Sequence, residues 1–218
     1  MNVIGHIQVE GWAEQPTRAK TTELAVYLAL HADRPVAAER LRTVIWAYDP
    51  SRGDVALATV HQEISRLRRC LGPEQFPEAK GGYQLADTVS SDWGDFEALT
   101  EASRAVGQAE SIDYLRRALS LVRGEPFAEV APKAYGWAFD EVIVAQMEAA
   151  VSGAAHVMAE QCLALGKGAD AAWAVRQGLL AVPRDERLRE DRLVAAAREG
   201  GQGRLSRPLW KLRWRSPA

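Results

Sequence analysis

Residues 57–71 read LATVHQEISRLRRCL, and this stretch decides how the first part of the chain is interpreted. Its apolar residues recur at steps of three and four positions, as they do along one face of an α-helix, at Leu57, Val60, Ile64, Leu67 and Leu71. The same steps on the opposite face give Thr59, Gln62, Arg66 and Arg69. Gly72 and Pro73 then end the helix. The pattern predicts an amphipathic helix with one buried face and one polar face.

Two helices are expected before this one. The first begins near Thr21, turns Leu24 and Leu28 inward and ends near Pro35. The second follows Pro35 and closes near residues 48–50. Ahead of both, alternating apolar residues at positions 3–9 predict a short strand.

The residues after the quoted helix predict a β-hairpin. Gly81 and Gly82 indicate a turn between two short strands, one near Phe76 and the other at Tyr83 and Leu85. Three helices followed by a small β-hairpin wing form the outline of a winged helix-turn-helix.

Strand signals vanish after residue 92, and helical patterns continue to the end. Asp92 or Asp95 is expected to cap the first of these helices. A long run over 137–165 is expected to be helical with a kink at Gly153, and a last helix over 185–198 is expected to end at the glycines of 200–203. The small, bulky, small and proline positions of a tetratricopeptide-type second helix are matched by Ala171, Val175, Gly178 and Pro183.

The predicted fold class is therefore mainly α: an N-terminal winged helix-turn-helix with its wing, then an all-α tetratricopeptide-like domain. We divide the chain into a front domain (1–90), a helical domain (91–200) and a basic tail (201–218). A length of 218 residues accommodates two small domains. The tail carries arginines, a lysine and two tryptophans, which predict added phosphate binding, contact with a membrane surface or, more simply, a cap of tryptophans on the repeat domain.

Composition excludes several classes of protein. Apolar residues make up 47% of the chain, enough for a sizeable core. Cys70 and Cys162 are far apart in sequence, which argues against a disulfide framework or a zinc module and fits a reducing cytoplasm. No stretch is long and apolar enough to span a membrane. The front domain carries ten Lys and Arg against eleven Asp and Glu, so any case for nucleic acid depends on a local surface.

Enzymatic motifs are also missing. The sequence at 166–168, GKG, lacks the earlier glycine and the following Ser or Thr of a phosphate-binding loop. The four histidines have no metal-ligand spacing. We expect no enzyme activity, no cofactor and no metal.

The strings ISRLRRCLG at 64–72 and GGYQL at 81–85 resemble the recognition helix and wing of OmpR/PhoB-type DNA-binding domains. The string LRRALSLVRGEPF at 115–127 resembles the opening of a bacterial transcriptional activation domain (BTAD). The whole order is similar to the actinobacterial regulators typified by the Streptomyces antibiotic regulatory proteins (SARPs). This resemblance implies a cytoplasmic transcriptional activator that binds double-stranded DNA, commonly as a homodimer, and whose helical domain contacts RNA polymerase.

In this motif the third helix lies in the major groove. Its polar row can read bases, because Gln pairs with adenine, Arg with guanine and Thr with a thymine methyl. The candidate DNA-binding residues are Thr59, His61, Gln62, Ser65, Arg66, Arg68, Arg69 and Lys80. His61 and Ser65 flank the polar row. Arg68 is expected to contact a DNA phosphate, and Lys80 belongs to the wing. Glu63 is expected to weaken the attraction to DNA by its charge.

Two alternatives remain open. In one, the winged helix no longer binds DNA, and the helical repeats hold a peptide or partner protein. In the other, the chain is a fragment of a larger sensor. A continuous positive surface around Arg66 would favour DNA binding. A third helix whose positive charges are neutralised would favour the alternative in which the helical repeats hold a peptide or partner protein.

Overall fold

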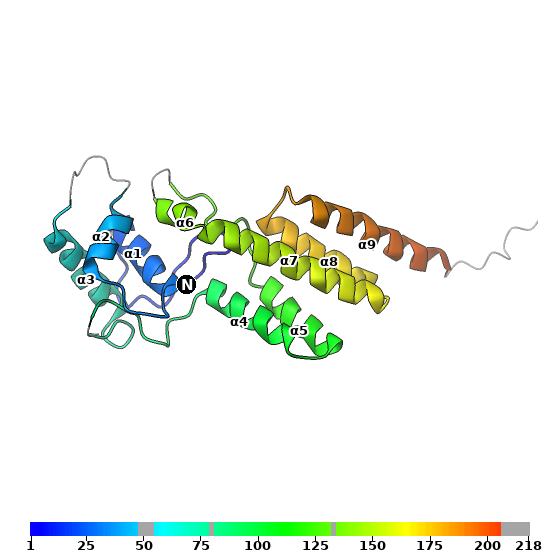
Figure 1. Cartoon of the computed structure of the whole chain (residues 1–218), viewed down its shortest axis with the longest axis horizontal. Coiled ribbons are helices and arrows are strands. Elements are labelled where there is room, and N and C mark those ends of the chain that lie inside the picture. The colour runs from blue at the N-terminus through cyan, green and yellow to red at the C-terminus, as the bar shows by residue number, and fades with distance from the viewer. Residues whose placement is uncertain (48–54, 79–80, 132–133, 206–218) are drawn as a thin grey trace, which may run out of the picture.

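The computed structural model describes residues 1–47, 55–78, 81–131 and 134–205. Its helices are α1 (Ala19–Leu30), α2 (Ala38–Ile45), α3 (Leu57–Leu71), α4 (Asp92–Arg104), α5 (Gln108–Leu119), α6 (Gly136–Asp140), α7 (Ile143–Ala164), α8 (Gly168–Ala181) and α9 (Glu186–Leu205). Figure 1 shows α1–α3 gathered at one end of an elongated molecule and α4–α9 extending away from them. The expectation of a mainly helical chain is confirmed.

The front domain is built on α1, which packs against both α2 and α3. Leu24 and Leu28 of α1 are fully buried, as are Leu41 of α2 and Leu67 of α3. The apolar stripe predicted on residues 57–71 therefore faces the core, and α3 has the predicted bounds. The predicted end of the second helix, at residues 48–50, lies outside the described residues.

The predicted hairpin wing is not found among the described residues. Tyr83 forms a single antiparallel bridge with Val36, which lies between α1 and α2, and not with the residues around Phe76. The Val36 N–H donates to the Tyr83 carbonyl (2.9 Å), and the Tyr83 N–H donates back (2.8 Å). Gly82 permits this approach, because a Cβ there would lie 2.7 Å from the Val36 carbonyl oxygen. The glycine pair thus serves a close backbone contact with Val36, while the two predicted hairpin segments share one backbone hydrogen bond, from the Ala86 N–H to the Gln75 carbonyl (2.9 Å).

The strand predicted at residues 3–9 is reduced to isolated bridges, and residues 3–6 bind the helical domain. Asp92 accepts hydrogen bonds from the backbone N–H groups of Val3 (2.8 Å) and Ile4 (3.0 Å). Arg123 donates to the same carboxylate at 2.6 Å. Burial raises the pKa of Asp92, although these donors act in the opposite direction. The predicted boundary at residue 90 assigns this segment to the front domain, whereas its hydrogen bonds go to the other one.

In the helical domain, α7 packs along α8 and α8 packs along α9, with the α4–α5 pair joined to them mainly through α5. Gly178 lies where these helices meet. A Cβ on it would be 2.6 Å from Cβ of Ala155 on α7 and 2.7 Å from Cδ1 of Leu188 on α9. Ala171 and Val175 of the predicted tetratricopeptide pattern are fully buried. The small residues do allow close helix packing.

Three predicted details of this domain are wrong. The cap of α4 is Ser91, whose hydroxyl accepts from the Gly94 N–H at 3.1 Å, because both predicted aspartates lie inside the helix. The break in the long helical run comes at Val142, which has a left-handed backbone (φ 62°), and α7 continues through Gly153. The last helix, α9, continues through the glycines of 200–203. The side chains of the basic tail lie outside the described residues.

Across the described ranges, no helix has the length and apolarity needed to cross a bilayer. The same residues contain no group of three or more His, Cys, Asp or Glu side chains arranged to hold a metal ion.

Both cysteines should be slow to react with thiol reagents in the folded protein. Cys70 on α3 and Cys162 on α7 are free and buried. Burial raises the pKa of each thiol, which lowers the fraction of reactive thiolate at neutral pH. Titration with a chromogenic disulfide at pH 7 should show two thiols only after denaturant is added. Prompt reaction of either thiol without denaturant would contradict the packing described for its helix.

Candidate nucleic-acid interface

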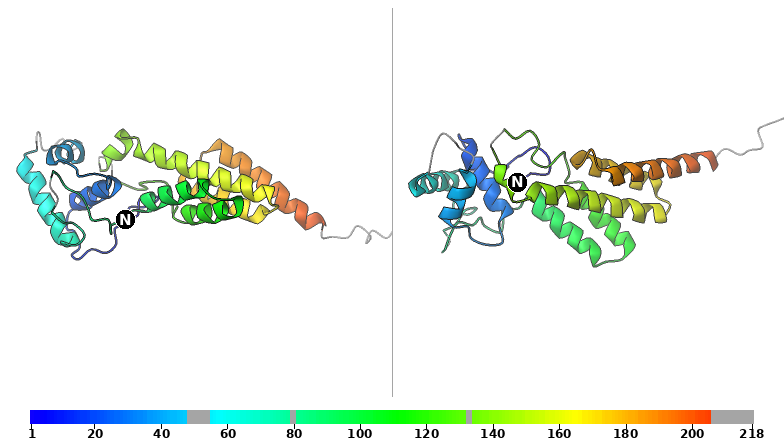
Figure 2. Two further views of the ribbon diagram at one scale, coloured as in Figure 1. Left: turned by 60° about the horizontal axis from the view of Figure 1, so that its bottom comes forward. Right: turned by 45° about the horizontal axis from the view of Figure 1, so that its top comes forward.

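The exposed face of α3 carries polar side chains at the end of the molecule. Its exposed residues are Ala58, His61, Gln62, Ser65 and Arg69. Both views in Figure 2 place α3 at the extremity opposite α9, so the helical domain does not cover it. An uncovered helix with such side chains has the dimensions and donors to enter a major groove.

Glu63, the one acidic residue within α3, points away from this face. Its side chain is buried and accepts hydrogen bonds from the Thr21 hydroxyl (3.1 Å) and from Arg18 (3.2 Å). Arg66 forms an ion pair with the same carboxylate. The expected repulsion between Glu63 and DNA is therefore not supported by its position, because the carboxylate is buried and neutralised by arginines.

The spacing of α3 contains a signal for this burial. Glu63 lies four positions before Leu67 and seven before Cys70, and all three are buried along one side of the helix. Sequence reasoning that counts Glu63 by its charge alone misses its place beside the apolar stripe.

The remaining candidates occupy different surroundings. Thr59 is partly buried at the start of α3. Arg66 is also partly buried, and its charge is met by Glu63 inside the protein. Arg68 donates from Nε to the Phe76 carbonyl (3.2 Å), with its guanidinium 5.0 Å from the centre of the Phe76 ring. Lys80 lies outside the described residues. The structure thus brings His61, Gln62, Ser65 and Arg69 together in solvent and sets the other described candidates nearer the core.

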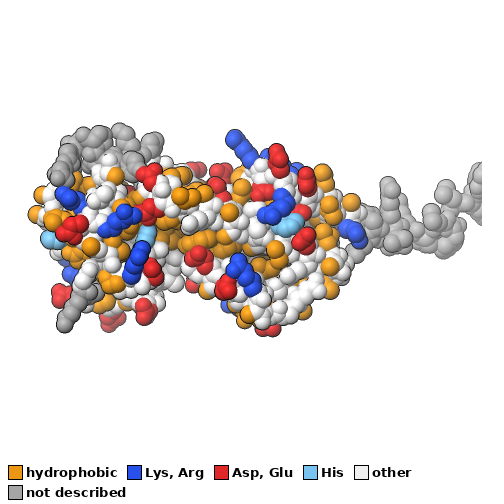
Figure 3. Space-filling view, in the orientation of Figure 1, with side chains coloured by type: hydrophobic (Ala, Val, Ile, Leu, Met, Phe, Trp, Pro, Cys, Tyr) orange, Lys and Arg blue, Asp and Glu red, His pale blue; other side chains and the backbone are white. Residues whose placement is uncertain are grey.

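Charges of both signs are interspersed on the face of the molecule that Figure 3 shows. On the face shown in Figure 3, basic and acidic side chains alternate over both halves, and neither sign forms one continuous patch. Of the arginines on α3, Arg69 is the exposed one. Any contact of α3 with phosphates therefore depends on few cations.

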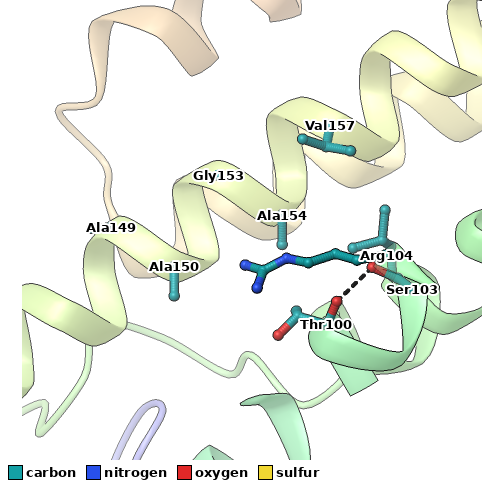
Figure 4. A pocket seen from close by; sticks show the side chains of 9 residues that line it. Thr100, Ser103, Arg104, Ala149, Ala150, Gly153, Ala154 and Val157 are labelled. Carbon is teal, nitrogen blue, oxygen red and sulfur yellow. Dashed lines mark hydrogen bonds between the residues drawn. The ribbon is translucent and has the colours of Figure 1, made fainter. Parts of the chain in front are cut away.

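A hollow of about 300 Å³ lies between α4 and α7. Arg104 of α4 extends across it toward α7, where Ala150, Gly153 and Ala154 form a smooth wall (Figure 4). Val157, which borders the hollow, is 42% exposed. The hollow combines an apolar wall with a guanidinium that already pairs with Glu101 of the same helix (2.5 Å), so its surface suits an uncharged protein segment.

Comparisons with known proteins agree with this architecture. Residues 14–85 match the family model "Transcriptional regulatory protein, C terminal", and residues 91–204 match "Bacterial transcriptional activator domain". None of the curated proteins gives a significant match.

A solved structure of Mycobacterium tuberculosis EmbR, in complex with a low affinity phosphopeptide, has a similar fold. It matches with a TM-score of 0.68 at 22% identity over 93% of this chain and 55% of that one. The chain therefore spans about half the length of EmbR. Because the second family model covers more than half of the sequence and follows a regulatory C-terminal domain, the protein belongs to the bacterial transcriptional activator domain family and is a SARP-like transcriptional regulator.

Proposed function

We propose that the protein regulates transcription by placing α3 in the major groove of double-stranded DNA. The observation that carries this proposal is the exposed face of α3, which presents an imidazole, an amide, a hydroxyl and a guanidinium while its one carboxylate is buried. Gln62 and Arg69 carry the groups that form bidentate hydrogen bonds with adenine and guanine. His61 and Ser65 stand beside them as further donors.

Other residues have supporting roles in this proposal. Arg68 and Lys80 contact phosphates, and Thr59 lies at the edge of the interface. Arg66 pairs with Glu63 within α3, and the same carboxylate accepts a hydrogen bond from Thr21 of α1. The protein acts as a homodimer on two half-sites. The helical domain contacts RNA polymerase, and the hollow between α4 and α7 offers a surface for such a protein partner.

Selection from a random pool of DNA duplexes tests the proposal. We expect the chain to enrich a repeated motif at low and at physiological salt. Arg69→Ala and Gln62→Ala should each weaken binding to that motif by about 5- to 150-fold, which corresponds to the ~1–3 kcal/mol of a lost base contact. Arg176→Ala, which removes an exposed arginine of α8, is the matched control and should bind as the parent does.

Two other results would contradict the proposal. The first is selection without any enriched motif. The second is weak binding that Arg69→Ala and Arg176→Ala reduce equally, since that would reflect general charge and not α3. Either result would favour the alternative in which the winged helix does not bind DNA and the hollow in the helical domain binds a partner protein.

A further inference from the structure

One side of α1 is attached to the helical domain. Glu23, Tyr27 and His31 recur every four residues and so share that side. The buried carboxylate of Glu23 accepts a hydrogen bond from the Tyr135 N–H at 3.1 Å. The ring of Tyr27 meets the edge of the buried Trp137 ring, with 4.8 Å between the ring centres. These contacts join α1 to the segment that contains α6.

Glu141, just after α6, gathers three partners from the front domain. Its Oε2 lies 3.1 Å from Nε2 of His31. Its Oε1 accepts from the Tyr27 hydroxyl at 3.4 Å and forms an ion pair with Arg40 of α2. The carboxylate is 21% exposed, so its ion pairs are less screened than those of a fully exposed group.

The ring of His31 is tied to both domains. Its Nδ1 lies 2.8 Å from the Tyr27 carbonyl oxygen, while Nε2 faces Glu141. Both nitrogens thus face oxygen atoms, one on α1 and one just after α6. The ring also stacks on Tyr27, with 4.1 Å between the ring centres.

Glu141 is presented from a constrained backbone. Tyr135 and Val142, at either end of this short segment, have φ values of 56° and 62°. A left-handed conformation is costly for a β-branched residue such as Val142 and persists only where surrounding contacts fix it. The direction in which Glu141 points is therefore set by the fold of the segment.

The same helix connects these contacts to α3. On α1 and just before it, Thr21 and Arg18 hold Glu63 of α3, as described above. Glu141 therefore acts on α3 through α1, with one carboxylate on each side of that helix.

We propose that Glu141 is a positioning residue, which fixes the orientation of α3 relative to the helical domain. The consequence rests on the proposed DNA binding. If two chains pair through their helical domains, a fixed orientation holds the two copies of α3 at one separation, and the dimer accepts one spacing of half-sites.

The test measures orientation and DNA binding separately, on the full chain. Spin labels on Thr43→Cys of α2 and Arg176→Cys of α8, both exposed positions, report the distance between the domains by pulsed electron paramagnetic resonance. We expect one narrow distance distribution in the parent and a distribution at least twice as broad in Glu141→Ala. Glu141→Gln, which keeps an acceptor oxygen, should be intermediate. Asp140→Ala removes an exposed carboxylate next to Glu141 and should leave the distribution narrow.

On DNA, Glu141→Ala should bind a single half-site within twofold of the parent. Its preference among duplexes with different half-site spacings should fall by about tenfold. Loss of affinity for the single half-site would assign Glu141 to folding of the front domain and overturn the positioning role.

The two proposals fail in different ways. An unchanged distance distribution in Glu141→Ala overturns the positioning role, whatever the DNA result. Absence of a preferred DNA sequence in the parent overturns the proposed function, while the distance measurement still decides the role of Glu141. If Glu141→Ala does not fold, Arg40→Gln removes one partner at a side chain that is 54% exposed and should broaden the distribution in the same direction.

Discussion

Replacing Asp92 by alanine is expected to lower the free energy of unfolding by about 3–5 kcal/mol, because its buried carboxylate is the acceptor for two buried N–H groups and for Arg123. The substitution leaves two buried N–H groups, those of Val3 and Ile4, without an acceptor and deprives Arg123 of its carboxylate. Each unsatisfied buried donor alone costs roughly 1–3 kcal/mol. Urea denaturation followed by circular dichroism measures the change.

Asp95→Ala is the control for this experiment. Asp95 is exposed in the same first turn of α4, so its loss removes a favourable charge at the helix start and little else, about 0.3–1 kcal/mol. Asp92→Asn keeps one acceptor oxygen and should fall between the two. Equal stability of the Asp92 and Asp95 alanine variants would show that the first residues do not dock on the helical domain.

Replacing Gly178 by valine should destabilise the protein by roughly 3 kcal/mol through overpacking. The new Cβ would lie 2.6 Å from Cβ of Ala155 and 2.7 Å from Cδ1 of Leu188. The Leu188 side chain can change rotamer to relieve its clash, but Cβ of Ala155 is fixed to the α7 backbone and cannot. The better helix propensity of valine offsets about 0.5 kcal/mol of this cost. Thermal unfolding should show the loss as a lower Tm.

The matched comparison is Gly153→Val on α7. Apart from the neighbouring backbone of α7 itself, no atom lies within 4 Å of the Cβ that this change introduces. Helix propensity should therefore decide the outcome, and the variant should be as stable as the parent or slightly more so. Similar losses from both valines would mean that Gly178 matters for its backbone and not for the helix contact.

Much of this fold follows from local patterns in the sequence. The step of three and four from Leu57 to Leu71 predicted the bounds of α3, because a continuous apolar stripe is sufficient to define an amphipathic helix. The pattern around Gly178 likewise predicted close helix packing, because small side chains at that spacing let two helix backbones approach each other.

The wrong predictions concern contacts between distant segments. The glycines at 81–82 give the same local signal whether the next residue pairs with a neighbouring strand or with Val36, and only the tertiary fold decides between them. The alternation at residues 3–9 was read as a strand, yet Val3 and Ile4 are both fully buried because Asp92 holds consecutive amides.

The candidate site shows the same division. Sequence reasoning identified α3 and the residues on its exposed face, including Gln62 and Arg69. It could not show that Glu63 is buried against Arg18 and Thr21, because both lie more than 40 positions away. The ion pair of Glu63 with Arg66, three positions further along α3, is by contrast a local pattern. The role of each candidate residue toward DNA stays a prediction.

The docking of the first residues on Asp92 changes how the front domain is attached to the helical domain. A domain joined to its neighbour by one linker can turn in any direction. Here the chain leaves the helical domain after His6, which forms a bridge with Ala128, and returns to it at Ser91, next to the Asp92 carboxylate that holds Val3 and Ile4. Two neighbouring attachments restrict the motion of a domain more than a single linker does. Together with the contacts that Glu23 and Tyr27 make with the α6 segment, these attachments restrict rotation of the front domain against the helical domain.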